Sequence, residues 1–186
     1  MTGVAWPPRP GRNAPARRRA EILRVDHAGE LGAVHIYRGQ RAVMEAGGRE
    51  AISGQLERME AQEARHLARF EALLCDEETR PTLLAPLWRG AGFALGVGTA
   101  LIGEKAAHAC TEAVEDVIEA HYAGQIAELE GRAPALAAEL AQFRGEELAH
   151  RDEAVAAGAH DAPGYGLLAG VIRAGCKVAI AISEKI

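Results

Sequence analysis

Two Glu-x-x-His pairs constrain the fold of this chain more than any other feature of its sequence. They are Glu63–His66 and Glu147–His150, and each lies in the middle of a segment with helical periodicity. Residues three apart share one face of a helix, so the carboxylate and the imidazole of a pair can bind the same ion. A single pair would be a weak signal, because about one is expected by chance in a chain this rich in Glu with seven His.

The hydrophobic pattern predicts helices almost throughout the 186 residues, and no stretch alternates with period two for long enough to form a strand. We expect residues 1–19 to form a disordered basic arm and residues 20–186 to form a single helical-bundle domain. The predicted helices span about 19–46, 49–76, 87–130 with a bend near its glycines, 135–157 and 167–184.

The two long helices without a Glu-x-x-His pair each offer one glutamate near the middle. Glu30 lies in the first predicted helix and Glu115 in the third. One Glu from each of two helices, with Glu-x-x-His from each of two others, is the ligand set of di-iron and di-manganese carboxylate bundles. The sequence therefore predicts an all-α, ferritin-like four-helix bundle with a two-metal site and one or two additional C-terminal helices.

The chemistry of these six side chains favours two particular metals. Four buried carboxylates without a cation would cost more than their packing returns, and two divalent ions cancel the four charges. Oxygen-rich ligands with two imidazoles suit Fe(II) or Mn(II). A structural zinc site is disfavoured, since no cysteine accompanies the set. The three cysteines, odd in number and without a CxxC motif, argue against a disulfide framework.

Further polar residues lie close to the predicted ligands along the helices. Asp26 and His27 precede Glu30 by about one turn, and they either orient the ligands or are polar residues on the solvent side of the helix. His121 and Tyr122 follow the third glutamate by about two turns. Because Tyr122 falls on the ligand face, it is a candidate for a ligand-orienting or substrate-side role.

Glu146 directly precedes Glu147 in the fourth predicted helix. Neighbouring residues on a helix point about 100° apart, so only one of the two can face the bundle axis. We expect Glu146 to point away from the metal ligands.

The overall charge of −5 and the pI of about 5.8 give no electrostatic case for binding nucleic acid. The N-terminal arm contains no apolar core of a secretory signal, and its arginines would attract an anionic membrane only weakly.

Two segments are unusually apolar. Residues 90–103 carry no charge but are too short to span a bilayer, so this half of a helix is either buried or faces a membrane. The spacing of Gly92 and Gly96 would allow a close helix contact in the buried case. The C-terminal run 165–182 is interrupted by Arg173 and Lys177, so we expect it to lie in a membrane interface rather than to cross.

At these residues the sequence resembles the demethoxyubiquinone hydroxylase family of ubiquinone biosynthesis. The resemblance spans about residues 22–186, and its DHAGE, PLW-to-HY and AGCKVAI blocks are not shared with ferritins in general. The segments that carry it are RVDHAGELGAVHIYRGQ, QEARHLARFEALL, RPTLLAPLWRGAGFALGVGTALIGEKAAHACTEAVEDVIEAHY, FRGEELAHRDEA and AGCKVAIAISEKI.

The resemblance implies a di-iron monooxygenase that uses O₂ to hydroxylate the ring of a polyprenylated demethoxyubiquinol. It places the metal ligands of the family on the same six residues, with Glu63 and Glu147 bridging and Glu30 and Glu115 terminal. It also implies a polyprenyl benzoquinol substrate and peripheral attachment to the cytoplasmic face of the inner membrane. The chain has no flavin or nicotinamide domain, so the electrons come from an external reductant, from the quinol or from a reductant that binds directly. Other ubiquinone-biosynthesis proteins and a second copy of the chain, in a homo-oligomer, are candidate partners, and the sequence does not reveal the oligomeric state.

Two other functions fit a bundle of this kind. One is a ferroxidase or iron-storage protein without an organic substrate, and the other is a purely structural metal bundle. Storage shells need a hydrophilic interior, whereas this chain has two apolar segments. Oxygen uptake that depends on added quinol would favour the monooxygenase.

Overall fold

The structure of the protein is a computed structural model that describes residues 14–186. Within this range every regular element is a helix, which confirms the predicted all-α class. The elements are α1 (Ala14–Ala46), α2 (Glu50–Asp76), α3 (Ala85–Ile102), α4 (Glu104–Leu129), α5 (Pro134–Ala156), the short 3₁₀ helix η1 (Ala159–Asp161) and α6 (Tyr165–Ser183).

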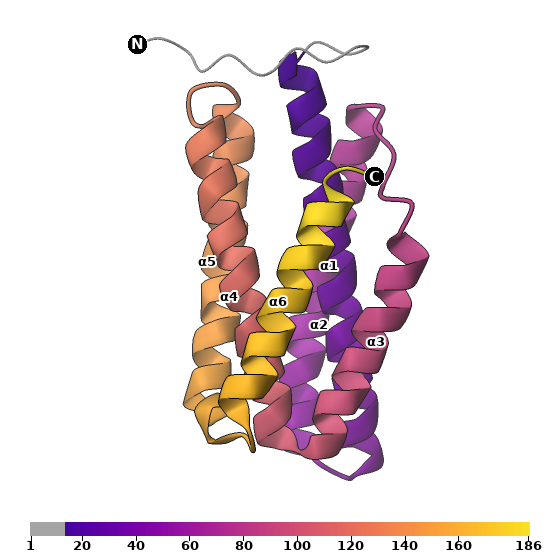
Figure 1. The fold of residues 1–186 in the computed structure, drawn as a ribbon, viewed down its shortest axis with the longest axis vertical. Coiled ribbons are helices and arrows are strands. Elements are labelled where there is room, and N and C mark those ends of the chain that lie inside the picture. The colour runs from indigo at the N-terminus through magenta and orange to yellow at the C-terminus, as the bar shows by residue number, and fades with distance from the viewer. Residues whose placement is uncertain (1–13) are drawn as a thin grey trace.

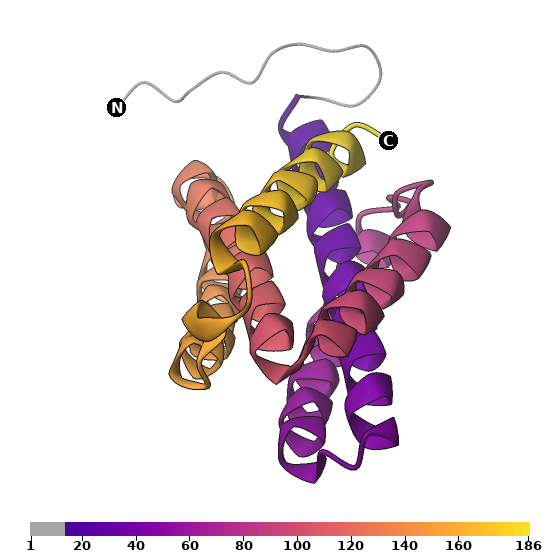
Figure 2. The ribbon, with the colours of Figure 1, turned by 60° about the horizontal axis from the view of Figure 1, so that its bottom comes forward.

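Two antiparallel hairpins form the bundle, α1 with α2 and α4 with α5 (Figure 1). The other two helices lie outside it, with α3 packed on α1 and α6 packed mainly on α4 (Figure 2). The four-helix bundle is as predicted, but only one of the added helices is C-terminal. The other, α3, is inserted between the second and third helices of the bundle.

The predicted helix 87–130 is two helices. Gly103 separates α3 from α4 with a φ of 145°, a conformation that residues with a side chain rarely adopt. The chain reverses at this glycine, so that α4 runs back along the bundle (Figure 1). The sequence pattern predicted only a bend, because helical periodicity resumes directly on both sides of Gly103.

The first helix begins at Ala14, earlier than expected. The end of the predicted arm is therefore helical, while residues 1–13 lie outside the described part of the chain. In the extension Arg18 contacts Glu128 of α4 at 3.0 Å, and the next residue, Arg19, contacts Glu77 at 2.8 Å, so ion pairs hold this end of α1 against its neighbours.

Glycines bring α3 directly against the backbone of α1. A Cβ atom on Gly96 would overlap the carbonyl oxygen of Ile36, and one on Gly92 would lie 2.7 Å from the carbonyl oxygen of Gly32. This confirms the close contact predicted from the Gly92–Gly96 spacing. The inner face of α3 is thus buried on α1, while its outer face stays exposed.

Two apolar clusters fill the two ends of the bundle. One contains Phe70, Leu140 and Phe143, and the other contains Leu56 and Met59. Phe70 follows His66 by one turn, and Met59 precedes Glu63 by one turn. The polar ligand candidates therefore lie in a layer between the two apolar clusters.

We predict that Gly96→Ala lowers the free energy of unfolding by about 1–3 kcal/mol, because the methyl group has to force α3 away from α1. Gly98→Ala is the matched control, since nothing lies within 4 Å of a Cβ at this exposed position of the same helix. The control should raise stability by up to about 1 kcal/mol. Urea unfolding measures both, and equal effects of the two variants would contradict this description of the α1–α3 contact.

Candidate metal centre

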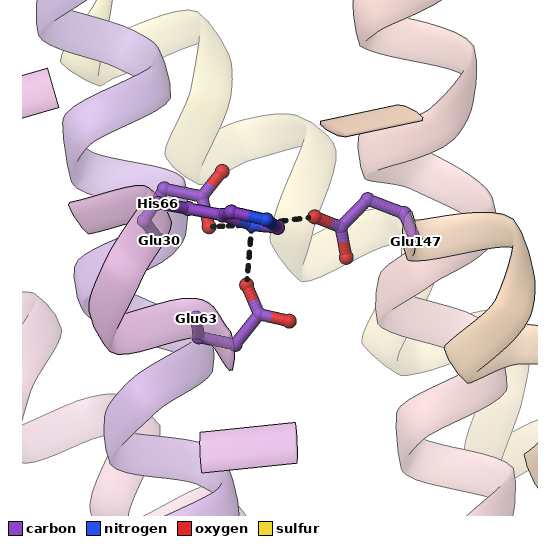
Figure 3. Close-up of side chains that lie close together, drawn as sticks. All are labelled: Glu30, Glu63, His66 and Glu147. Carbon is purple, nitrogen blue, oxygen red and sulfur yellow. Dashed lines mark ion pairs between the residues drawn. The ribbon is translucent and has the colours of Figure 1, made fainter. Parts of the chain in front are cut away.

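The six side chains predicted as ligands meet at the centre of the bundle. They form two groups whose ligand atoms lie within 4.8 Å of one another. One group is Glu30, Glu63, His66 and Glu147, shown in Figure 3, and the other is Glu63, Glu115, Glu147 and His150. Glu63 and Glu147 belong to both groups, so these two carboxylates lie between the two positions where an ion can sit.

All six side chains are buried, and Glu63 and Glu147 are fully so. Each of the four bundle helices contributes to the set: α1 and α4 supply one glutamate each, and α2 and α5 supply one Glu-x-x-His pair each. The antiparallel arrangement brings the midpoints of all four helices to one level, which is why residues so distant in sequence converge.

Both imidazoles present Nδ1 to the carboxylates. His66 Nδ1 lies 3.5 Å from Glu30, 3.4 Å from Glu63 and 3.2 Å from Glu147 (Figure 3). His150 Nδ1 lies 2.9 Å from Glu63 and 3.6 Å from Glu147. Each imidazole therefore bridges the two hairpins, and Nδ1 is the atom available to a metal.

The Nε2 atoms point outward to acceptors on the opposite hairpin. His66 Nε2 lies 2.8 Å from Glu146, and His150 Nε2 lies 3.4 Å from the side-chain oxygen of Gln62. The expectation that Glu146 points away from the ligands was wrong in part. Its side chain does not face the bundle axis, but it contacts His66 from the outer side. Partners of this kind fix the orientation of a metal-binding imidazole.

Two buried tyrosines hold the outer carboxylates from the opposite hairpin. Tyr37 of α1 donates a hydrogen bond of 2.5 Å to Glu115, and Tyr122 of α4 donates one to Glu30. Sequence reasoning picked out Tyr122 but missed Tyr37. A signal was present, because Glu30 and Glu115 are each followed by a tyrosine seven residues later.

The other polar candidates lie beside the six rather than among them. Asp26 accepts a hydrogen bond of 2.7 Å from Gln125 and lies 3.5 Å from His121. His27 is buried and lies 3.9 Å from Glu71. The structure thus places Asp26 and His121 together in a small polar group, and it directs His27 toward the surface of α2.

The unpartnered polar atoms show how well the six residues suit metal ions. Among these residues the buried atoms without a hydrogen bond are Oε2 of Glu30 and Glu115, both carboxylate oxygens of Glu63 and Glu147, and Nδ1 of His66 and His150. Two ions would use all of them, each taking one oxygen from each shared carboxylate, one from an outer carboxylate and one imidazole nitrogen. Apart from the ion-pair distances of 2.9–3.6 Å between the two imidazoles and the carboxylates, these buried atoms have no partner, so the set fits two metals.

The protonation of the metal-free cluster is strongly perturbed. Burial raises the pKa of Glu30 and of Glu115, whose neighbours are also acidic. Burial acts in the same direction on Glu63, but contacts with His150 and His66 outweigh it and lower its pKa to about 2. Burial disfavours the charged form of His150, yet Glu147 and Glu63 raise its pKa to about 9. Without a cation, protons balance the carboxylate charge.

An apolar cavity of about 380 Å³ lies beside the cluster, between α1, α3, α4 and α6. Gly29 and Val114, the sequence neighbours of Glu30 and Glu115, line it. At its rim the indole N–H of Trp88 on α3 donates a 2.9 Å hydrogen bond to the hydroxyl of Ser183 on α6. The volume lies within the ~300–1,000 Å³ range of small-molecule sites, and the lining suits a hydrophobic molecule.

Comparison with known proteins gives consistent matches. Residues 17–183 match the family described as ubiquinone biosynthesis protein COQ7. The chain is 52% identical over 177 residues to a 3-demethoxyubiquinol 3-hydroxylase of Rhodospirillum rubrum, covering 95% of this chain and 82% of that protein. It is 48% identical over 169 residues to the mitochondrial NADPH-dependent 3-demethoxyubiquinone 3-hydroxylase of Bos taurus, covering 89% of this chain and 76% of the relative.

We predict that Tyr37→Phe and Tyr122→Phe each lower the equilibrium affinity for Co²⁺ by about 10–100-fold, because an outer carboxylate loses the donor that orients it. Tyr165→Phe is the control: its hydroxyl donates a 2.7 Å bond to Glu112, which is not one of the six. Titration followed by Co²⁺ absorbance measures the affinities. A similar loss in all three variants would show that the effect follows the loss of any tyrosine–glutamate hydrogen bond and is not specific to the site.

Proposed function

This chain belongs to the ubiquinone biosynthesis protein COQ7 family, and we propose that it is a 3-demethoxyubiquinol 3-hydroxylase that uses O₂ at a two-iron centre. One structural observation supports the proposal independently of the sequence similarity. A cluster of buried carboxylate and imidazole atoms that make no hydrogen bond, suited to two metal ions, lies beside an apolar cavity large enough for a ligand. The ferroxidase alternative receives no support, since the relatives are named hydroxylases and the cavity is apolar.

We assign the ligand roles from the way the side chains are shared. Glu63 and Glu147 belong to both groups and would bridge the ions, while Glu30 and Glu115 each belong to one group and would be terminal ligands. His66 and His150 would complete one ion each through Nδ1. The donor set favours iron or manganese over zinc, and iron when bound supplies the electrons that activate O₂.

The two tyrosines determine which oxygen of each terminal carboxylate is available. Tyr37 occupies Oε1 of Glu115 and Tyr122 occupies Oε1 of Glu30, which leaves Oε2 of both facing inward. Each phenol therefore orients its carboxylate and keeps one oxygen free for an ion. Burial raises the pKa of both phenols, so that they remain proton donors at neutral pH.

The cavity would bind the ring and the first part of the polyprenyl tail. In the overall reaction one oxygen atom of O₂ enters the ring in place of hydrogen and the other leaves as water. Two electrons and two protons are required, and an external reductant would provide the electrons. The apolar lining from α1, α3, α4 and α6 would exclude bulk water from the reacting ring.

Apolar residues are exposed on the two added helices. They are Leu87, Phe93, Leu101 and Ile102 on α3 and Leu167, Val171, Val178 and Ile182 on α6. Among the described residues α6 alone is long and apolar enough to cross a membrane by length and composition.

Arg173 of α6 contacts Asp116 of α4 at 2.7 Å, which holds α6 along the bundle. We propose that α3 and α6 lie in the membrane interface of the cytoplasmic face, with the cavity open to the lipid.

We predict that Glu147→Ala abolishes quinol-dependent oxygen consumption, a loss of more than about 100-fold, because both ions lose a shared ligand. Glu139→Ala on the same helix is the control, since this carboxylate pairs with Arg69 at the surface. The measurement combines an oxygen electrode with mass analysis of the quinol after reaction under ¹⁸O₂. Oxygen uptake that needs only Fe(II), without label in the ring, would favour a ferroxidase.

We predict that the protein floats with liposomes at high salt and is released by detergent, because apolar burial is insensitive to ionic strength. Replacing both Leu101 and Leu167 by Glu should abolish flotation, as these are among the most exposed apolar side chains of α3 and α6. Val155→Glu on α5 is the control for an added charge. Release by salt alone would contradict an interfacial role for these helices.

A further inference from the structure

The metal cluster is closed to hydrated ions at both ends of the bundle. Phe70, Leu140 and Phe143 fill one end, and Phe143 also stacks on His66 with ring centroids 4.2 Å apart. Leu56 and Met59 are part of the cluster that fills the other. A divalent ion that passed through either apolar cluster would have to give up its hydration shell among mostly apolar side chains.

The side covered by α3 and α6 is also closed to hydrated ions, because the side chains there are apolar. Between these helices and the cluster lies the apolar cavity, whose few polar groups include the mutually bonded Trp88 and Ser183. This route suits O₂ and a hydrophobic substrate. The remaining two sides are the tightly packed interfaces within the hairpins, α1 against α2 and α4 against α5.

Among the described residues, a part-exposed carboxylate contacts a residue of the cluster directly on the side between α2 and α5. Gln62 of α2 donates a hydrogen bond to Glu146 of α5, and Gln142 donates one of 3.2 Å to the same carboxylate. The side chain of Glu146 is 28% exposed, whereas that of His66, which it contacts at 2.8 Å, is 2% exposed. A single carboxylate thus contacts both the solvent and a residue of the cluster.

We propose that Glu146 and Gln62 form the port through which metal ions reach the cluster. Glu146 receives the hydrated cation from solvent, separates from Gln62 and replaces part of the hydration shell while the ion passes between α2 and α5. The ion then reaches the shared carboxylates of Glu63 and Glu147, immediately next to the port residues in sequence. The inference rests on the metal-binding part of the proposed function and is independent of the substrate.

Ions would enter and leave through the same port, and this distinguishes a port residue from one that only orients a ligand. A carboxylate that stabilises the ion in passage speeds uptake and release alike and leaves the equilibrium unchanged. A carboxylate that only orients His66 stabilises the bound state, so its loss speeds release. Glu146→Gln keeps the size of the side chain and one acceptor oxygen, which can still contact His66, but removes its charge. Glu139→Gln is the matched control, since Glu139 lies on the same helix with a side chain 25% exposed.

The test uses the full-length protein loaded with Co²⁺. Stopped-flow absorbance follows release into a chelator and reloading of the same preparation, with circular dichroism to verify that the helices persist. We expect Glu146→Gln to slow both rates by about tenfold or more, with two Co²⁺ per chain still bound at equilibrium, and Glu139→Gln to change neither. Uptake by the unaltered chain should also slow as ionic strength rises.

If Glu146→Gln left the rates of Co²⁺ uptake and release unchanged, or made release faster, the proposed port would be wrong. Uptake by the unaltered chain that does not depend on ionic strength would also count against it, and this measurement needs no variant. Failure of the unaltered chain to bind two Co²⁺ would instead contradict the metal centre itself. The stoichiometry therefore tests the proposed site, while the two rates test the route into it.

Discussion

The contact between two helical hairpins through four buried carboxylates and two imidazoles is the interaction on which the rest of the structure depends. The α1–α2 and α4–α5 hairpins are each well packed internally, but at the middle of the bundle charged side chains join them. Buried carboxylates are tolerated only when paired, protonated or bound to cations. Two divalent ions would neutralise all four, and the apolar clusters at either end would then close the bundle around them.

The two hairpins supply the cluster in the same way. Each provides a glutamate followed seven residues later by a tyrosine, and each provides a Glu-x-x-His pair preceded by Gln62 or Glu146. Every supporting contact crosses to the other hairpin, so each half of the cluster is oriented by the opposite half. The symmetry ends at Gln62 and Glu146, the outer partners of the two histidines, because only Glu146 carries a charge. The apolar cavity lies on the opposite side of the cluster. One side of the site is therefore suited to a hydrophobic substrate and the other to ions.

Spacing predicted the two Glu-x-x-His pairs, because a helix places residues three apart on one face whatever surrounds it. Glu30 and Glu115 were predicted from their mid-helix positions and from the ligand set of carboxylate bundles. Tyr37 was missed although it follows Glu30 by the same seven residues that separate Tyr122 from Glu115. The roles of Gln62 and Glu146 could not be predicted from spacing, since they depend on which helix lies opposite and on which of its residues lie at the same level. The break at Gly103 was underestimated for a related reason: one residue with a positive φ reverses the chain without interrupting the helical pattern. The bundle was thus predictable from local periodicity, whereas the placement of α3 depended on tertiary contacts with α1.

The central claim is that two irons occupy the layer between the hairpins. Crystals of the iron-loaded protein, grown without oxygen and measured on both sides of the iron absorption edge, test it most directly. The account predicts two anomalous peaks, roughly 3.5–4 Å apart, with the carboxylates of Glu63 and Glu147 between them and Nδ1 of one histidine on each. A single peak, or peaks away from these carboxylates, would contradict the account.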